Sequence, residues 1–228
     1  MEIKEKRTSH FISFNTILLV LICLVSICVN SCAVIYPKKH KKPVIYLYPQ
    51  QQQEVSVKID LKGSFTFTEP LYENGWNVIA EPDGKIFNPS DGKNYPYLFW
   101  EADIVADYKL DEGFVVEGNK TKTFLDSILP VLGLNENEKA EFISFWNPIM
   151  EKNKFNKIRF AGEDYTSNAK LNIVPKPDVI TRVFMVFKKC ESFEIIPRQK
   201  ISEPKKREGF TVIEWGGVNL DENTEEDL

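Results

Sequence analysis

Two blocks of alternating apolar and polar residues, with an amphipathic helical stretch between them, most strongly constrain the fold of this 228-residue chain. Successive side chains of a β-strand point to opposite faces, so the alternation in residues 54–61 (EVSVKIDL) places one side of that segment in a core. Runs rich in β-branched and aromatic residues predict strands at 44–48, 54–61, 64–68, 76–80, 85–87, 95–100, 114–116, 158–160, 171–174, 182–187, 193–196 and 210–214.

The middle of the chain has helical rather than strand periodicity. Apolar residues recur at helical spacing in residues 123–132 and again in residues 139–150. Asn135, followed three residues later by Glu138, predicts a capping box at the start of the second helix, and Pro148 should bend or stop its end. The order strands, helices, strands predicts an α+β fold: a mostly antiparallel sheet or sandwich with a helical hairpin (about 121–151) packed on one face.

The positions of histidine and cysteine exclude several kinds of catalytic site. Both histidines precede residue 41, and Cys190 is the one cysteine after residue 32. A disulfide within the body of the chain, a Ser-His-Asp triad, a Cys-His pair and a histidine-rich zinc site therefore lack the residues they need. We expect no cofactor and no bound metal, and no Gly-rich phosphate loop is present.

The first thirty-two residues read as a targeting signal. A basic start precedes an apolar run over residues 17–29, which is short for a membrane span. The run ends in Val29-Asn30-Ser31-Cys32, which resembles a bacterial lipobox. That resemblance implies a signal peptide over residues 1–31 and a diacylglyceryl group on Cys32. The rest of the chain would then lie outside the cytoplasm, tethered to a bacterial membrane.

An uncleaved membrane anchor is the alternative for the same segment. Residues 11–29 could just span a bilayer, although lysines at positions 38, 39, 41 and 42 lie on the far side and oppose that orientation. We favour the lipoprotein, followed by a basic linker (32–42), one globular domain (43–217) and an acidic tail (218–228). The chain has 29 Lys+Arg against 33 Asp+Glu, so it carries no overall basic footprint for nucleic acid.

Several phrases of the body resemble a family of uncharacterised proteins that open with a KPVIYLYP-like sequence. The resemblance covers about residues 42–217 and implies one intact domain. That family has no established activity, ligand or catalytic residue, so the resemblance assigns no site. The phrases that carry it are KPVIYLYP (42–49), GWNV (75–78), PDG (82–84), YLFWE (97–101), FISFWNP (142–148), PKPD (175–178) and RVFM (182–185).

The candidate functional residues are carboxylates and aromatics. Glu101 and Asp103 share one face of a predicted strand, and such a pair can act as the acid and base of a glycosidase or bind Ca²⁺; acids at a strand end are the ordinary alternative. Trp76 and Trp100 lie near polar residues and turns and are candidates for stacking on sugar rings. Cys190 follows two lysines that could lower the pKa of its thiol, but no histidine base accompanies it.

Three functions remain open at this point. The leading one is a membrane-anchored, non-catalytic domain that binds an envelope glycan or a partner protein. The second is a carboxylate-dependent glycan hydrolase that uses Glu101 and Asp103. The third is a structural envelope protein, either lipidated or held by an uncleaved single-pass anchor.

Overall fold

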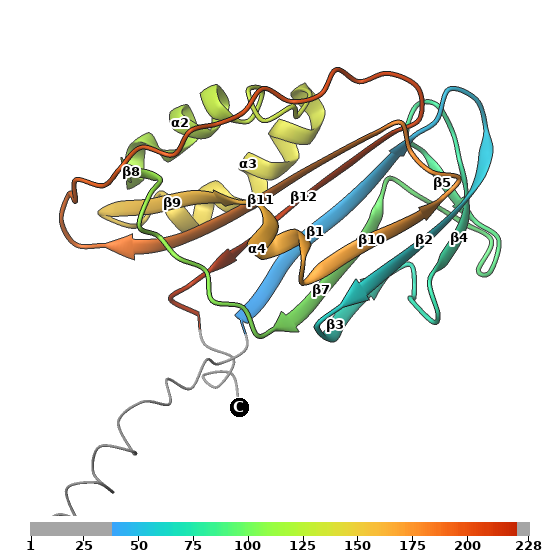
Figure 1. The fold of residues 1–228 in the computed structure, drawn as a ribbon, viewed down its shortest axis with the longest axis horizontal. Helices are drawn as coiled ribbons and strands as arrows, with labels where there is room; N and C mark the ends of the chain where they lie inside the picture. Colours follow the sequence, from blue (N-terminus) through green and yellow to red (C-terminus); the bar gives the residue numbers. More distant parts are fainter. Residues whose placement is uncertain (1–37, 223–228) are drawn as a thin grey trace, which may run out of the picture. The chain divides into compact units, whose positions relative to one another are not determined.

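A computed structural model describes residues 38–222, which form two β-sheets and a layer of helices (Figure 1). The predicted signal peptide, Cys32 and the alternative anchor at 11–29 lie outside the described residues. The seven-stranded sheet has the order β3 (Gly63–Glu69), β7 (Leu98–Ile104), β1 (Lys38–Tyr48), β12 (Thr211–Asn219), β11 (Val179–Cys190), β9 (Phe155–Ala161) and β8 (Phe114–Glu117). The five-stranded sheet has the order β10 (Ala169–Val174), β2 (Gln53–Leu61), β4 (Trp76–Ala80), β5 (Ile86–Asn88) and β6 (Lys93–Tyr95).

Both sheets are antiparallel, except that β11 and β12 run parallel. A parallel pair needs a long return connection, and residues 191–210 supply it. This connection, which we call the return segment, passes over α2 and α3 in Figure 1. The prediction of a sheet-rich α+β fold is confirmed.

Two apolar cores lie on opposite faces of the seven-stranded sheet. Ile45 and Leu47 of β1 pack with Val55 and Val57 of β2 in the core between the two sheets. Neighbouring residues of the same strand belong to the second core, which the sheet shares with α2 (Thr121–Ile128) and α3 (Glu136–Met150). The near-continuous apolar run at the start of the domain is explained by this arrangement, because β1 is buried on both faces.

The helices follow from their sequence signals. Asn135 accepts a hydrogen bond from the Glu138 backbone N–H, and the Glu138 side chain accepts one from Asn135, which confirms the predicted capping box. Helix α3 continues through Pro148 to Met150. A short turn, η1 (Gly118–Lys120), precedes α2, and one-turn α4 (Glu163–Thr166) joins β9 to β10.

Two predictions about segments need correction, and one strand was not predicted. The lysine run expected in a linker over 32–42 belongs to β1, which starts at Lys38 and whose Lys38 Nζ donates to the Leu220 carbonyl at 3.2 Å. Residues 193–196, predicted as a strand, lie in the return segment with no strand partner among the described residues. Strand β6 was missed because Lys93–Tyr95 carries no apolar alternation.

Candidate functional site

A polar, tyrosine-lined hollow of about 400 Å³ lies at the end of β1. We call it the tyrosine hollow. Four parts of the chain converge on it: the end of β1, the turn after β4, strand β6 with the residue that follows it, and the first turns of α3. Its lining is Tyr46, Tyr48, Asp83, Gly84, Lys85, Asn94, Tyr95, Pro96, Asn137 and Glu141.

Tyr46 and Tyr48 form the inner wall of the tyrosine hollow. They stand two residues apart on one face of β1, and their rings are parallel with centroids 6.1 Å apart. The Tyr46 hydroxyl donates to Glu141 Oε2 at 2.8 Å, and the Tyr48 hydroxyl donates to Glu138 Oε1 at 2.9 Å. Burial and these carboxylates raise the pKa of both tyrosines, so both hydroxyls stay protonated at neutral pH.

Glu138 fixes the position of Tyr48 through its hydrogen bond to the tyrosine hydroxyl. Its side chain is 0% exposed and is paired with Arg207 of the return segment, whose guanidinium lies 5.8 Å from the Tyr48 ring centroid. On the other side, a Cβ at Gly84 would come within 2.6 Å of the Tyr48 ring. Gly84 also has φ +92°, so the turn and the ring together require glycine there.

The rim of the tyrosine hollow is exposed and carries groups of both charges. Asp83, Lys85, Asn94, Asn137 and Glu141 are all solvent-exposed. The Asp83 carboxylate accepts a hydrogen bond from the Lys85 backbone N–H at 3.0 Å, which shapes the turn. The hollow therefore offers amide and ammonium donors beside carboxylate and amide acceptors, as a hydroxyl-rich ligand requires.

Tyr95 closes one side of the tyrosine hollow and is half-buried. Its hydroxyl donates to Asp91 Oδ2 at 2.6 Å, and this hydrogen bond raises the pKa of Tyr95 to about 12 and lowers the pKa of Asp91. The hydroxyl is held by the protein, so the ring position is fixed before any ligand arrives.

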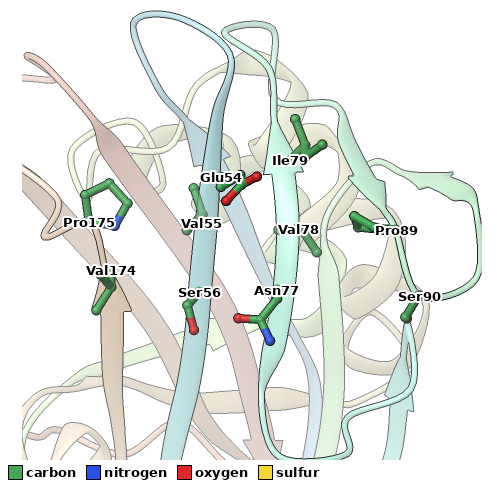
Figure 2. Close-up of a pocket in the computed structure, with 10 residues that line it drawn as sticks. All are labelled: Glu54, Val55, Ser56, Asn77, Val78, Ile79, Pro89, Ser90, Val174 and Pro175. Carbon is green, nitrogen blue, oxygen red and sulfur yellow. The ribbon is translucent and has the colours of Figure 1, made fainter.

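A second depression, of about 530 Å³, lies on the outer face of the five-stranded sheet (Figure 2). We call it the sheet groove. Val174 and Pro175 stand on one side of it and Pro89 and Ser90 on the other, with β2 and β4 between them. Its full lining is Glu54, Val55, Ser56, Asn77, Val78, Ile79, Pro89, Ser90, Val174 and Pro175.

The carboxylates predicted as an acid–base pair lie elsewhere. Glu101 and Asp103 are half-buried on one face of β7, as the alternation predicts. Glu101 Oε1 accepts a hydrogen bond from the Lys42 backbone N–H at 3.3 Å, at an irregularity in the pairing of β1 where Lys42 has φ +56°. Neither acid lines the tyrosine hollow or the sheet groove, and Glu101 has a structural partner at this irregularity.

The two tryptophans predicted as stacking platforms are buried. Trp100 is 0% exposed in the core between the sheets, where its ring packs edge-on against Phe65, so it offers no ring face to a ligand. Trp76 is 2% exposed, and its indole N–H donates to the Pro70 carbonyl at 2.8 Å. Trp76 does contribute to the wall of a 270 Å³ depression beside the sheet groove.

Cys190 is buried and unpaired, and burial followed by the nearby charge of Glu194 raises its pKa. The flanking Lys188 does act to lower this pKa, as expected, but burial outweighs it and the net shift is upward. Within residues 38–222, no cluster of three or more His, Cys, Asp or Glu side chains is placed to hold a metal ion. In the same range, no helix is both long enough and apolar enough to span a membrane.

A buried ion pair within the seven-stranded sheet was also missed by sequence reasoning. Arg182 of β11 pairs with Glu214 of β12, which is 1% exposed, and donates to the Ala169 carbonyl at 2.7 Å. Its guanidinium lies 4.6 Å from the ring centroid of Tyr165 in α4. These contacts join the two sheets, so we assign Arg182 and Glu214 a structural role.

Comparison with known proteins adds little to the site. No family model matches the chain, and no solved structure matches it. A protein described as "Uncharacterized protein in bglA 3'region", from Butyrivibrio fibrisolvens, is 48% identical over 65 residues. The match covers 27% of this chain and 66% of that protein, so the chain spans slightly less than two thirds of that relative's length.

Proposed function

We propose that this chain is a lipid-anchored, extracytoplasmic protein whose domain binds a glycan of the cell envelope in the tyrosine hollow. The observation that carries the proposal is the rim of that hollow, where two amides, two carboxylates and one ammonium group surround fixed tyrosine rings. A sugar presents hydroxyls that both donate and accept, together with apolar ring faces, and these groups complement the rim and the tyrosine walls.

The carboxylates of the tyrosine hollow support the binding of a sugar. Glu141 accepts a hydrogen bond from Tyr46, and Asp83 accepts one from its own turn. Glu138, the third acid nearby, is fully buried in an ion pair with Arg207. Glu138 is therefore unavailable to a sugar, whereas Asp83 and Glu141 are exposed and keep acceptor positions for its hydroxyls.

The chain that leads from the proposed anchor enters β1 at Lys38, and the tyrosine hollow lies at the other end of that strand. Lys38, the first residue of β1, follows Cys32 by six positions, so a lipid on that cysteine lies at most about 22 Å from Lys38 along the chain. Tyr48 is the last residue of the same strand, roughly 33 Å from Lys38 at the usual rise per residue. The tether therefore joins the domain at the end of β1 that is remote from the tyrosine hollow.

The binding half of the proposal is tested with full-length protein in detergent micelles. Isothermal titration calorimetry with N-acetylglucosamine oligomers should show saturable binding, and Asn137→Ala should weaken it at least tenfold because a rim amide is lost. Asn74→Ala, which truncates an exposed asparagine outside the tyrosine hollow, should leave the affinity unchanged. Release of shorter oligomers during the titration would show hydrolysis and overturn the non-catalytic assignment.

The anchoring half is tested by mass spectrometry of protein expressed in a bacterium. We expect the mature chain to start at Cys32 and to carry a diacylglyceryl thioether. Cys32→Ser should abolish both the lipid and the cleavage, whereas Cys28→Ser should leave both intact. An unlipidated wild-type chain that retains residues 1–31 would establish the uncleaved anchor instead.

A further inference from the structure

We infer that the tyrosine hollow is one end of a longer track, which takes a linear, uncharged oligosaccharide across the outer face of the five-stranded sheet. The inference rests on the proposed function and extends it from a sugar site to a site for a polymer. Three observations support it: the register of the strands, the depressions that adjoin one another on this face, and the charge of the residues that line them.

A single row of side chains crosses four strands toward the tyrosine hollow. Glu54 of β2 pairs with Ile79 of β4, Ile79 pairs with Phe87 of β5, and Phe87 pairs with Asn94 of β6. Paired residues of an antiparallel sheet point to the same face, and these four are half-buried or exposed, so the row lies on the outer face. Neighbouring strands are about 4.8 Å apart, so the row extends over roughly 14 Å.

Three adjoining depressions lie along this row. The sheet groove contains Glu54 and Ile79. A further hollow of about 460 Å³ is lined by Phe87 and Asn94, and it shares Asp83, Lys85 and Asn94 with the tyrosine hollow. Each depression therefore adjoins the next, either through a shared residue or through the Ile79–Phe87 pair.

The chemistry of the track favours a saccharide over an extended peptide. A peptide gains most of its affinity by pairing its backbone with a free strand edge. Strands β2, β4 and β5 each have a strand neighbour on both sides, so the face offers side chains rather than free backbone groups. Polar groups at Asn94, Ser56 and Asn77 lie beside apolar ones at Ile79 and Phe87, which suits hydroxyls and sugar ring faces.

The charge of the track selects an uncharged chain. Its lining includes the carboxylates of Glu54, Glu81, Asp83 and Glu141 against the single ammonium group of Lys85. A polyanionic glycan, such as a uronic acid polymer, would meet like charges along most of its length, and juxtaposed like charges oppose binding.

Chain-length dependence of binding tests the track with full-length protein in detergent micelles. Calorimetry with N-acetylglucosamine oligomers from monomer to hexamer should show affinity that rises at least tenfold between monomer and tetramer. Oligogalacturonates of equal length should bind at least tenfold more weakly. Affinity that does not change with length overturns the track while leaving the hollow as a sugar site.

Two variants separate the track from the tyrosine hollow. Phe87→Ala and Asn77→Trp should each remove the gain in affinity with chain length and leave the affinity for the monomer unchanged. Asn77 is exposed, so a tryptophan at this position fills the sheet groove without disturbing a core. Asn172→Ala, an exposed change on β10 outside the lining, is the matched control. Wild-type length dependence in both variants overturns the track. No binding by any oligomer overturns the proposed function and, with it, this inference.

Discussion

The ion pair between Glu138 and Arg207 offers a quantitative test of how the return segment supports the tyrosine hollow. Glu138 is 0% exposed and Arg207 is 31% exposed. Arg207→Met removes the partner charge but keeps much of the side-chain volume. Breaking a buried pair from one side costs about 3–5 kcal/mol, because a charge remains buried without its partner. Glu138 retains hydrogen bonds from Tyr48 and Asn135, and water reaches Arg207, so we expect about 3 kcal/mol.

The cost is measurable by urea unfolding of the full-length protein in detergent. All four tryptophans of the chain are buried in the domain, so their fluorescence reports its unfolding. Lys206→Met changes the adjacent lysine, whose side chain is 85% exposed, and should shift the unfolding free energy by less than about 0.5 kcal/mol.

A double-mutant cycle decides whether the buried charge is the cause. Glu138→Gln keeps the capping geometry and removes the charge, so adding it to Arg207→Met should recover at least half of the lost stability. If the two costs simply add, or if Arg207→Met costs less than about 1 kcal/mol, the reasoning from an uncompensated carboxylate is refuted.

Two further predictions concern stability. Gly217→Ala should destabilise the domain by about 1–3 kcal/mol in urea unfolding, because its Cβ would lie 2.8 Å from the Trp146 ring and 2.7 Å from a backbone oxygen. Asn172→Ala, an exposed change on β10, should be near neutral, and equal effects of the two substitutions would contradict the packing argument. Burial raises the pKa of Tyr46 and Tyr165 above the unfolded value near 10, so stability that is complete below pH 10 should fall as pH rises beyond it, and a flat profile to pH 12 would contradict this linkage.

Local signals in the sequence were sufficient for most of the elements. The capping box at Asn135 and the alternation in β2 both act within a few residues, so each is readable without knowledge of the fold. The failures have a physical cause too. Residues 193–196 have the composition of a strand but no partner strand among the described residues, and Ile195 is 93% exposed in the return segment. The propensity of a segment cannot show whether a sheet edge is available to it.

The tyrosine hollow was not predicted because its residues are distant in sequence. Each of them is also accounted for by the strand, turn or helix in which it lies. Tyr46 lies in an apolar run that reads as core, and it is indeed buried, so nothing in the run marks its hydroxyl. Asp83 and Gly84 read as a turn, which they form. Glu141 reads as an exposed helix residue, and only the packing of α3 beside β1 brings it within hydrogen-bond distance of Tyr46. Pairing of β1 with its neighbours and docking of α3 therefore create the site.

By contrast, the carboxylates singled out from sequence were chosen because they are close together in the chain. Proximity along a strand gives a shared face, and Glu101 and Asp103 have one. Proximity along a strand does not by itself create a concave surface, because such a surface requires a second element opposite the strand. Here the element opposite Glu101 is β1, at the irregularity around Lys42, and it uses the carboxylate as a backbone acceptor. A carboxylate engaged in this way supports the fold, and the groups left exposed around Tyr46 and Tyr48 are the ones available to a ligand.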